Sequence, residues 1–186
     1  NIAPADASMK EGKWLKKELE RTELMGKTLG LIGIGRIAQE LAKRAAAFGM
    51  KVIAVARTTK SSPVAEMVSM DRLLAESDYI SLHTPLTDET RGMINSSSIA
   101  KMKKGVRIIN TGRGPSIVEA DVVAALKDGK IAGYAADVFD KEPPEGSALL
   151  AAPNVLLTPH LGASTEENLV RLGDCIVDRV KAYAGK

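Results

Sequence analysis

The feature that most constrains this chain is residues 28–49, TLGLIGIGRIAQELAKRAAAFG, where a short apolar run meets closely spaced glycines and then a helical pattern. The run carries Leu29, Leu31 and Ile32 without a charge, which is typical of a buried parallel strand. Residues 36–48 then follow a helical period, and Gly49 is placed to end the helix. The apolar positions of that period are Ile37, Leu41, Ala45 and Phe48.

The turn between this strand and helix carries small residues at the spacing of a dinucleotide site. Gly33 permits a tight turn, and Gly35 lacks the Cβ atom that would keep a pyrophosphate away from the first N–H groups of the helix. Ala38 is the third small position, and it lets the helix and strand pack closely. Glycine-rich turns are common, but this one lies between a strand and a helix, and a second strand is predicted at residues 51–56. The pattern therefore indicates a dinucleotide-binding βαβ unit.

The rest of the chain continues the alternation of strands and helices. With 186 residues, of which 45% are hydrophobic, it can form one domain with a substantial core. We predict further strands at residues 79–83, 107–110, 131–138 and 155–157. We predict further helices at residues 5–12, 70–77, 96–104, 118–127 and 164–184. Alternating elements joined by short turns favour an α/β fold with a doubly wound, Rossmann-like parallel sheet.

Two parts are expected along the chain. Residues 1–27 should form a peripheral helix and a charged arm, and residues 28–186 the dinucleotide-binding domain. Because the chain opens at NIAPADAS without an initiator methionine, we expect it to be a fragment of a longer protein. The final predicted helix is amphipathic, with an apolar stripe made by Leu169, Leu172, Ile176, Val177 and Val180.

Charge and composition argue against several classes of protein. The net charge of +3 is mild and the basic residues are scattered among acidic ones, so we expect no nucleic acid partner. Aromatic residues make up only 3% of the chain, which disfavours base stacking. Cys175 stands alone, so neither a disulfide framework nor a metal site is expected, and a reducing cytoplasm fits best. No apolar run is long enough for a bilayer and no signal peptide is recognisable, so we expect no membrane association.

Residues capable of proton transfer and anion binding follow the predicted strands, at the edge where such sheets bind ligands. Arg113 lies in a glycine-flanked loop, where a guanidinium could hold a carboxylate through two parallel hydrogen bonds. His160 could exchange a proton with a carbonyl or hydroxyl oxygen, and a carboxylate such as Glu142 would raise its pKa and fix its tautomer. Each residue alone is more often solvated or structural. Together at one edge they favour hydride transfer to a carbonyl, which needs such a proton.

Five ordered motifs resemble the NAD-binding domain of the D-isomer-specific 2-hydroxyacid dehydrogenases: GLIGIGRIA, HTPLTDETRGMIN, KGVRIINTGRG, AADVFDKEPP and TPHLGAST. The resemblance covers nearly the whole chain, and PHLGAST with ASMKEGKW is most similar to the phosphoglycerate dehydrogenases of that family. It implies an oxidoreductase that moves a hydride between a nicotinamide and C2 of a D-2-hydroxy acid. The implied reaction converts 3-phosphoglycerate to 3-phosphohydroxypyruvate, in serine biosynthesis. A glyoxylate or hydroxypyruvate reductase, and a non-catalytic dinucleotide-sensing interaction protein, stay open as alternatives.

The resemblance also implies a role for each matching residue. His160 would be the general acid and base, Glu142 its carboxylate partner, and Arg113 the binder of the substrate's carboxylate and carbonyl. His83, by contrast, is expected to be structural. The cofactor would contact Gly33, Gly35, Arg36 and Ile37 with its pyrophosphate, Ala56, Arg57, Thr84 and Pro85 on its adenosine side, and Thr111, Gly112, Asp137, Gly162 and Ala163 around its nicotinamide.

Two positions depart from the family pattern. Where the second strand ends, a carboxylate would normally accept a hydrogen bond from the ribose 2′-hydroxyl, but the residue here is Ala56 and Arg57 follows it. The ribose 2′-hydroxyl of NAD therefore has no carboxylate to accept its hydrogen bond, while Arg57 could pair with the 2′-phosphate of NADP. We therefore expect NAD or NADP as the cofactor, with at least tolerance of NADP. The second departure is Gly112, where a small side chain is expected.

The family's second lobe closes over the substrate and is built mainly from sequence that precedes this domain. Nothing in the 186 residues matches it. We expect the chain by itself to bind the cofactor but to turn over poorly, because the cleft cannot close and exclude water. The full-length protein is expected to be a homo-oligomer that acts on a small 2-hydroxy or 2-keto acid.

Overall fold

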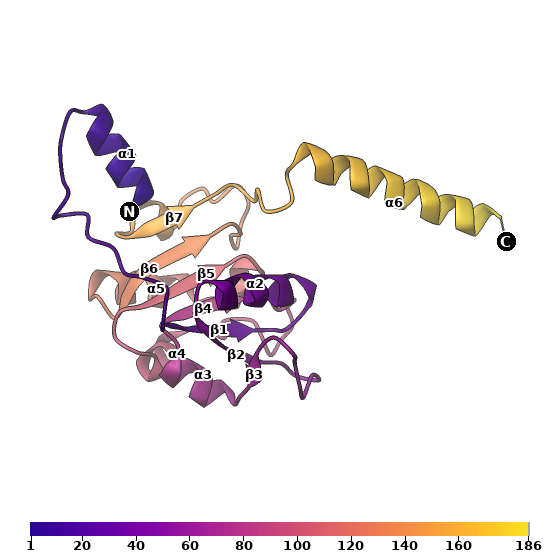
Figure 1. Cartoon of the computed structure of the whole chain (residues 1–186), viewed down its shortest axis with the longest axis horizontal. Coiled ribbons are helices and arrows are strands. Elements are labelled where there is room, and N and C mark those ends of the chain that lie inside the picture. Colours follow the sequence, from indigo (N-terminus) through magenta and orange to yellow (C-terminus); the bar gives the residue numbers. More distant parts are fainter. Residues whose placement is uncertain (186) are drawn as a thin grey trace.

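The computed structural model describes residues 1–185 and has one parallel sheet with helices on both faces (Figure 1). Within these residues seven strands pair in the order β3-β2-β1-β4-β5-β6-β7. They are β1 (Thr28–Ile32), β2 (Lys51–Val55), β3 (Glu66–Met67), β4 (Tyr79–Leu82), β5 (Val106–Asn110), β6 (Ile131–Ala136) and β7 (Val155–Leu157). The chain starts in the middle of the sheet, runs to one edge and returns to build the other. This is the doubly wound order of dinucleotide-binding domains, so the predicted fold class is confirmed.

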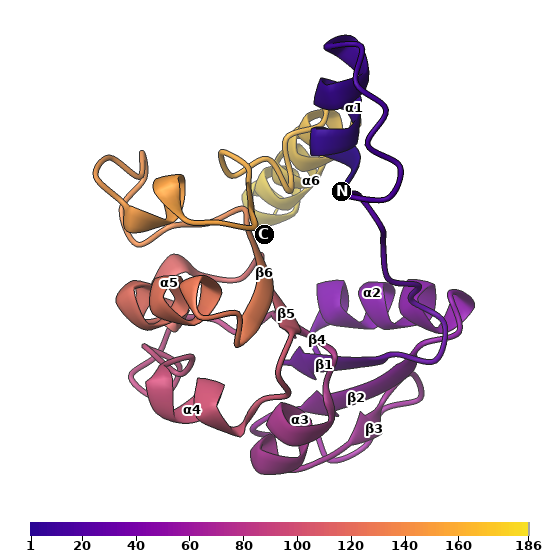
Figure 2. The same cartoon turned by 90° about the vertical axis from the view of Figure 1, so that its left-hand side faces the viewer.

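The helices divide the core into two layers. They are α1 (Ile2–Lys10), α2 (Arg36–Ala47), α3 (Met70–Glu76), α4 (Ser96–Lys101), α5 (Glu119–Lys127) and α6 (Glu166–Ala184), with 3-10 turns η1 (Gly114–Ser116) and η2 (Ala148–Ala151). Figure 2 shows α2 on one face of the sheet, and α3, α4 and α5 on the other. Residues such as Leu31 and Ala54 pack with α2, whereas Ile53 and Ile80 belong to the larger cluster on the opposite face. Side chains of successive strand residues thus fill both layers.

The buried face of α2 differs from the predicted one. We expected Ile37, Leu41, Ala45 and Phe48 to mark it, but Ile37 is 73% exposed and Phe48 63% exposed. The helix packs through Ala45 and Ala38, as predicted, and through Ala42, which was not singled out; all three are buried against the strands. Alanines let the helix axis approach the sheet closely, so the small residues form most of the contact. Leu41 is partly buried against the same cluster, whereas Ile37 and Phe48 point outward.

Most predicted elements are present, with ends that differ by a few residues. Strand β3 was not predicted, because two residues are too few to show a period; it forms by pairing Glu66 and Met67 with Ile53 and Ala54 of β2. Helix α1 starts at Ile2 rather than at the predicted residue 5, and β6 ends at Ala136 rather than at residue 138. None of these differences moves a predicted site loop away from the carboxyl ends of the strands.

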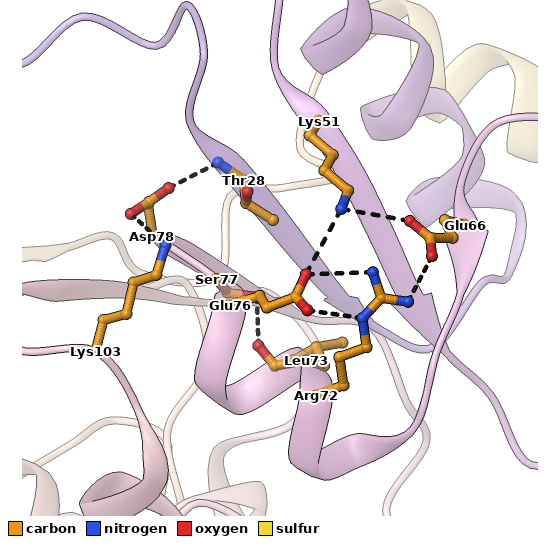
Figure 3. A network of polar contacts seen from close by, with 9 residues as sticks. All are labelled: Thr28, Lys51, Glu66, Arg72, Leu73, Glu76, Ser77, Asp78 and Lys103. Carbon is orange, nitrogen blue, oxygen red and sulfur yellow. Dashed lines mark hydrogen bonds and ion pairs between the residues drawn. The ribbon is translucent and has the colours of Figure 1, made fainter.

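Polar contacts tie the amino ends of the central strands together (Figure 3). Asp78, just before β4, accepts a hydrogen bond from the backbone N–H of Thr28 and pairs with Lys103. Lys51, at the start of β2, lies 3.4 Å from Glu66 and 3.6 Å from Glu76. This network stands opposite to the carboxyl edge, so it holds the sheet without occupying the predicted site.

The two ends of the chain lie away from the sheet. Residues 1–25 fold mainly on themselves, with the Asn1 side chain donating to the Glu20 carbonyl, and the first backbone bond to the sheet region runs from Gly26 to Gly49. Helix α6 projects from the body of the domain (Figure 1) and none of its residues is buried. The five residues of its apolar stripe are each about half to two-thirds exposed, from 48% at Val177 to 65% at Leu169.

Candidate functional site

The glycine turn is shaped by close backbone contacts on both sides. Gly33 has a positive φ of 98°, and its N–H donates to the carbonyl of Val55 at 2.8 Å. A Cβ atom at Gly33 would stand 2.8 Å from the carbonyl oxygen of His83, at the end of β4. Both the positive φ and this approach require glycine. The contacts with Val55 and His83 show that the turn packs between the ends of β2 and β4.

The first turn of α2 is open toward the carboxyl edge. Gly35 is the N-cap, no side chain caps the helix, and a Cβ at Gly35 would meet nothing within 4 Å. Uncapped N–H groups at a helix N-terminus attract anions, and the open space lets a phosphate reach them. Arg36 and Ile37 are exposed beside this opening. An opening of this kind suits an anion, and a pyrophosphate is the ligand predicted for these residues.

The residues predicted for the adenosine side lie at the ends of β2 and β4, the two neighbours of β1 in the sheet. Arg57 and Pro85 are exposed, and Ala56 and Thr84 are partly buried. His83 lies with Nε2 at 2.9 Å from the Ser81 hydroxyl, and burial lowers its pKa from the ordinary value. A neutral, hydrogen-bonded imidazole of this kind fits the structural role predicted for His83.

Arg113 is positioned by a residue that the sequence reasoning did not single out. Asn110, fully buried at the end of β5, donates from Nδ2 to the Arg113 carbonyl at 2.9 Å and accepts from the Gly112 N–H at 3.1 Å. The Arg113 guanidinium donates to the Gly112 carbonyl at 2.7 Å and its side chain stays exposed. A Cβ at Gly112 would approach the Leu82 carbonyl oxygen to 3.1 Å, so the expected small side chain would be tight here.

Gly114 joins the loop of Arg113 to the loop of Glu142. Its Cα lies so close to the backbone of Phe139 and Asp140 that a Cβ atom would collide with both. The loops that follow β5 and β6 are therefore in direct contact, and this contact was missed. A glycine beside Arg113 was the available signal, but its partner lies 25 positions along the chain and no local pattern points to it.

Glu142 and His160 form an ion pair across two loops. Nδ1 of His160 donates to Oε2 of Glu142 at 2.8 Å, and the Phe139 N–H donates to the other carboxylate oxygen at 3.1 Å. The hydrogen bond and charge of Glu142 raise the pKa of His160, while the same hydrogen bond lowers the pKa of Glu142. Arg113 is near enough for its charge to oppose protonation of the imidazole. The structure therefore brings the three predicted catalytic residues to neighbouring loops at one edge.

Asp137 holds the loop that carries His160. Its carboxylate accepts from the Thr158 hydroxyl at 2.6 Å and from the backbone N–H groups of Leu161 at 2.7 Å and Gly162 at 2.8 Å. Burial acts to raise its pKa, but these hydrogen bonds outweigh burial and the pKa is lowered. His160 itself has a positive φ of 57°, uncommon for a residue with a side chain. Asp137 was predicted to lie near the nicotinamide; its hydrogen bonds show that it also fixes the backbone around His160.

An open apolar depression of about 400 Å³ adjoins the ion pair. Glu142 and His160 contribute to its wall, together with Phe139, Pro143, Pro144, Leu150, Leu157, Thr158 and Pro159. Within residues 1–185, Nε2 of His160 makes no hydrogen bond, so this nitrogen is available to a substrate. The arrangement places the exchangeable proton of His160 beside an apolar wall and near the positive charge of Arg113.

The site follows the edge of the sheet from Arg57 after β2 to His160 after β7. An anion-binding helix N-terminus lies near one end, and a histidine–carboxylate pair with an arginine lies at the other. This combination is that of a dinucleotide-binding domain whose carboxyl edge also carries a group able to exchange a proton.

The chain belongs to the D-isomer-specific 2-hydroxyacid dehydrogenase family: the model of that family's NAD-binding domain matches residues 1–162. Hydroxypyruvate reductase of Thermotoga maritima is 52% identical over 97% of this chain and 60% of its own length. D-3-phosphoglycerate dehydrogenase of Methanocaldococcus jannaschii is 45% identical over 97% of this chain and 36% of its own length. Among solved structures, an acyclic imino acid reductase in complex with NADPH superposes with a TM-score of 0.92 at 29% identity, covering 99% of this chain and 60% of that one.

These comparisons confirm the predicted family and the nicotinamide dinucleotide as its cofactor. The chain spans between about a third and three-fifths of the length of these relatives. Within residues 1–185, no helix has the length and apolar character needed to cross a membrane. Within the same residues, no group of three or more histidine, cysteine, aspartate or glutamate side chains could hold a metal ion.

Proposed function

We propose that this chain is the cofactor-binding part of an NAD(P)-dependent D-2-hydroxyacid dehydrogenase. The observation that carries the proposal is the 2.8 Å hydrogen bond between His160 and Glu142. These two residues follow β7 and β6, and Arg113 follows the adjacent strand β5. Binding of a dinucleotide requires the glycine turn alone, whereas proton transfer also requires a donor such as His160. The pair therefore favours the enzyme over the interaction protein.

His160 is the proton donor when a keto acid is reduced. The chemistry that a nicotinamide dinucleotide supplies when bound is reversible hydride transfer to C2. Nε2 of the imidazolium gives its proton to the carbonyl oxygen, and the product is the 2-hydroxy acid. Glu142 stabilises the imidazolium and fixes Nδ1–H, so that Nε2 faces the substrate. In the oxidation direction the neutral imidazole takes the hydroxyl proton.

Arg113 binds the substrate's carboxylate and polarises its carbonyl. Its guanidinium can present parallel N–H groups to the carboxylate, which orients C2 for transfer. Asn110 and Asp137 act through the backbone: the first holds Arg113 and the second holds the loop of His160. Both are positioning residues.

The proposed substrate is a three-carbon 2-keto acid that carries oxygen on C3. Resemblance to phosphoglycerate dehydrogenases favours 3-phosphohydroxypyruvate, and the 52% identity to a hydroxypyruvate reductase favours the unphosphorylated acid. Ala56 and Arg57 at the end of β2 support use of NADP beside NAD, because the carboxylate that would bind the ribose 2′-hydroxyl is missing there.

The test uses the full-length protein. Oxidation of NADH and NADPH is followed with hydroxypyruvate, 3-phosphohydroxypyruvate and glyoxylate, and the product is assayed for the D configuration. His160→Ala should cut kcat by at least about 100-fold, in the range of lost general acid catalysis, while the Kd of the cofactor changes little. Persistent turnover in this variant would assign the proton transfer to another group. The 186-residue chain alone should bind the cofactor and turn over poorly.

A further inference from the structure

An ion pair links the two loops that flank the glycine turn on the adenosine side. Nη1 of Arg57, in the loop after β2, lies 3.1 Å from Oε2 of Glu89, in the loop after β4. Strands β2 and β4 are the two neighbours of β1, and the glycine turn starts where β1 ends. The two charges therefore meet across the end of the strand that leads into the cofactor site.

Arg57 is the first charged side chain after Ala56. At the end of the second strand, a carboxylate selects the ribose 2′-hydroxyl of NAD and an arginine accommodates the 2′-phosphate of NADP. In this structure the guanidinium that would receive the phosphate is already paired with a carboxylate. A 2′-phosphate must therefore displace Glu89, or share Arg57 with it.

The loop of Glu89 is ordered by its own hydrogen bonds. The hydroxyl of Thr90 donates to the Pro85 carbonyl at 2.8 Å and accepts from the Thr87 N–H at 2.8 Å. The Arg91 N–H donates to the Thr87 carbonyl at 2.9 Å. These bonds hold the backbone on both sides of Glu89, so its carboxylate faces Arg57 from a fixed loop.

The pair is also weak enough to be exchanged. The side chains of Arg57 and Glu89 are 74% and 70% exposed, and ion pairs in that environment gain little from each other because water screens them. A phosphate near neutral pH carries more charge than a carboxylate and presents three acceptor oxygens. It can compete for Arg57, but the negative charge of Glu89 opposes its approach.

We propose that Glu89 is a specificity-determining residue that lowers the affinity of this site for NADPH by competing with the 2′-phosphate for Arg57. The affinity for NADH, which lacks that phosphate, does not depend on this competition. The inference rests on the proposed cofactor site and names the residue that sets its preference. Arg57 by itself would favour NADP, and Glu89 offsets that preference.

The test measures the Kd of NADH and of NADPH for the 186-residue chain at low ionic strength. Glu89→Gln keeps the shape of the side chain and removes its charge. This variant should lower the Kd of NADPH by about two- to fivefold, the range that corresponds to the free energy of an exposed ion pair, and leave the Kd of NADH unchanged. The gain should shrink as salt is added, since screening weakens both the pair and the phosphate contact.

Two further variants separate competition at Arg57 from a change in overall charge. In an Arg57→Ala background, Glu89→Gln should no longer improve NADPH binding, because the shared partner is gone. Asp6→Asn removes the same charge from an exposed ion pair in α1, with Lys10, and should change neither Kd. An unchanged NADPH Kd in Glu89→Gln, or an equal gain for both cofactors, would overturn the proposal. If the unaltered chain bound neither cofactor, the proposed function itself would fail.

Discussion

His160 and Glu142 are joined by a hydrogen bond of 2.8 Å between Nδ1 and a carboxylate oxygen, and each shifts the pKa of the other. The pKa of His160 is raised, so the stability that it contributes is complete below its ordinary pKa and is lost as the pH rises through the raised value. The pKa of Glu142 is lowered, so its contribution is lost as the pH falls through that value. The ion pair is therefore strongest at pH values between the lowered pKa of Glu142 and the raised pKa of His160.

We expect Glu142→Gln to lower the pKa of His160 toward the ordinary value, because the neutral amide no longer stabilises the imidazolium. The chain has two histidines, so NMR titration of the two imidazole rings measures this directly. His83 is the internal control: its pKa is lowered by burial and should not move in the variant. An unchanged midpoint for His160 would contradict the assigned pairing.

Gly33 and Gly35 lie two residues apart in the same turn, but substitution should affect them differently. At Gly35 an added Cβ meets open space and φ is −68°, so Gly35→Ala should leave the free energy of unfolding within about 0.5 kcal/mol. The methyl group would, however, occupy the approach of the pyrophosphate, so we expect the Kd of NADH to rise at least about tenfold.

Gly33→Ala is the matched comparison. It combines a positive φ with an approach to the His83 carbonyl, so it should destabilise the fold by about 1–3 kcal/mol in urea unfolding. Equal stability of the two variants would contradict the distinction between a glycine required by the fold and one required by the ligand.

The sequence was sufficient to predict features set by local patterns. The strand, turn and helix around Gly33 follow from neighbouring residues, and the loops that hold Arg113, Glu142 and His160 follow from the alternation of elements. The parallel sheet then brings those loops to one edge without any further information, since the carboxyl ends of parallel strands meet there.

Features that depend on distant contacts could not be predicted in this way. Strand β3 exists only because Glu66 and Met67 pair with β2, and the hydrogen bonds of Asn110 are visible only once the loop after β5 is folded. The predicted buried face of α2 was wrong at Ile37 and Phe48, because the apolar period included these two residues, whereas close packing against the strands selects Ala38, Ala42 and Ala45. Hydrophobicity alone does not distinguish a contact made by small residues from one made by large residues.

Gly114 tests whether the contact between the loops after β5 and β6 matters for the site. Gly114→Ala places a methyl group into the backbone of Phe139 and Asp140, so these loops must separate. We expect a loss of about 1–3 kcal/mol in the free energy of unfolding, typical of overpacking. Since Phe139 also donates to Glu142, the pKa of Glu142 should rise toward its ordinary value. A variant with wild-type stability would show that the loops separate at no cost.

A substitution at Gly173 tests whether helix α6 is exposed to solvent in the isolated chain. Gly173 lies within the helix beside the apolar stripe, and an added Cβ there would meet nothing within 4 Å. A helix of this length without tertiary contacts is marginal in water, and glycine in its interior costs about 0.8–1 kcal/mol relative to alanine. Gly173→Ala should therefore raise the helical signal in circular dichroism and slow amide exchange in α6, while the unfolding of the sheet region and the Kd of NADH stay the same. Ala182→Gly, nearer the end of the same helix, should act in the opposite direction. If Gly173→Ala instead reduced helicity or changed the mass of the particle in solution, position 173 would be in contact with another surface, and α6 would not be solvent-exposed in the isolated chain.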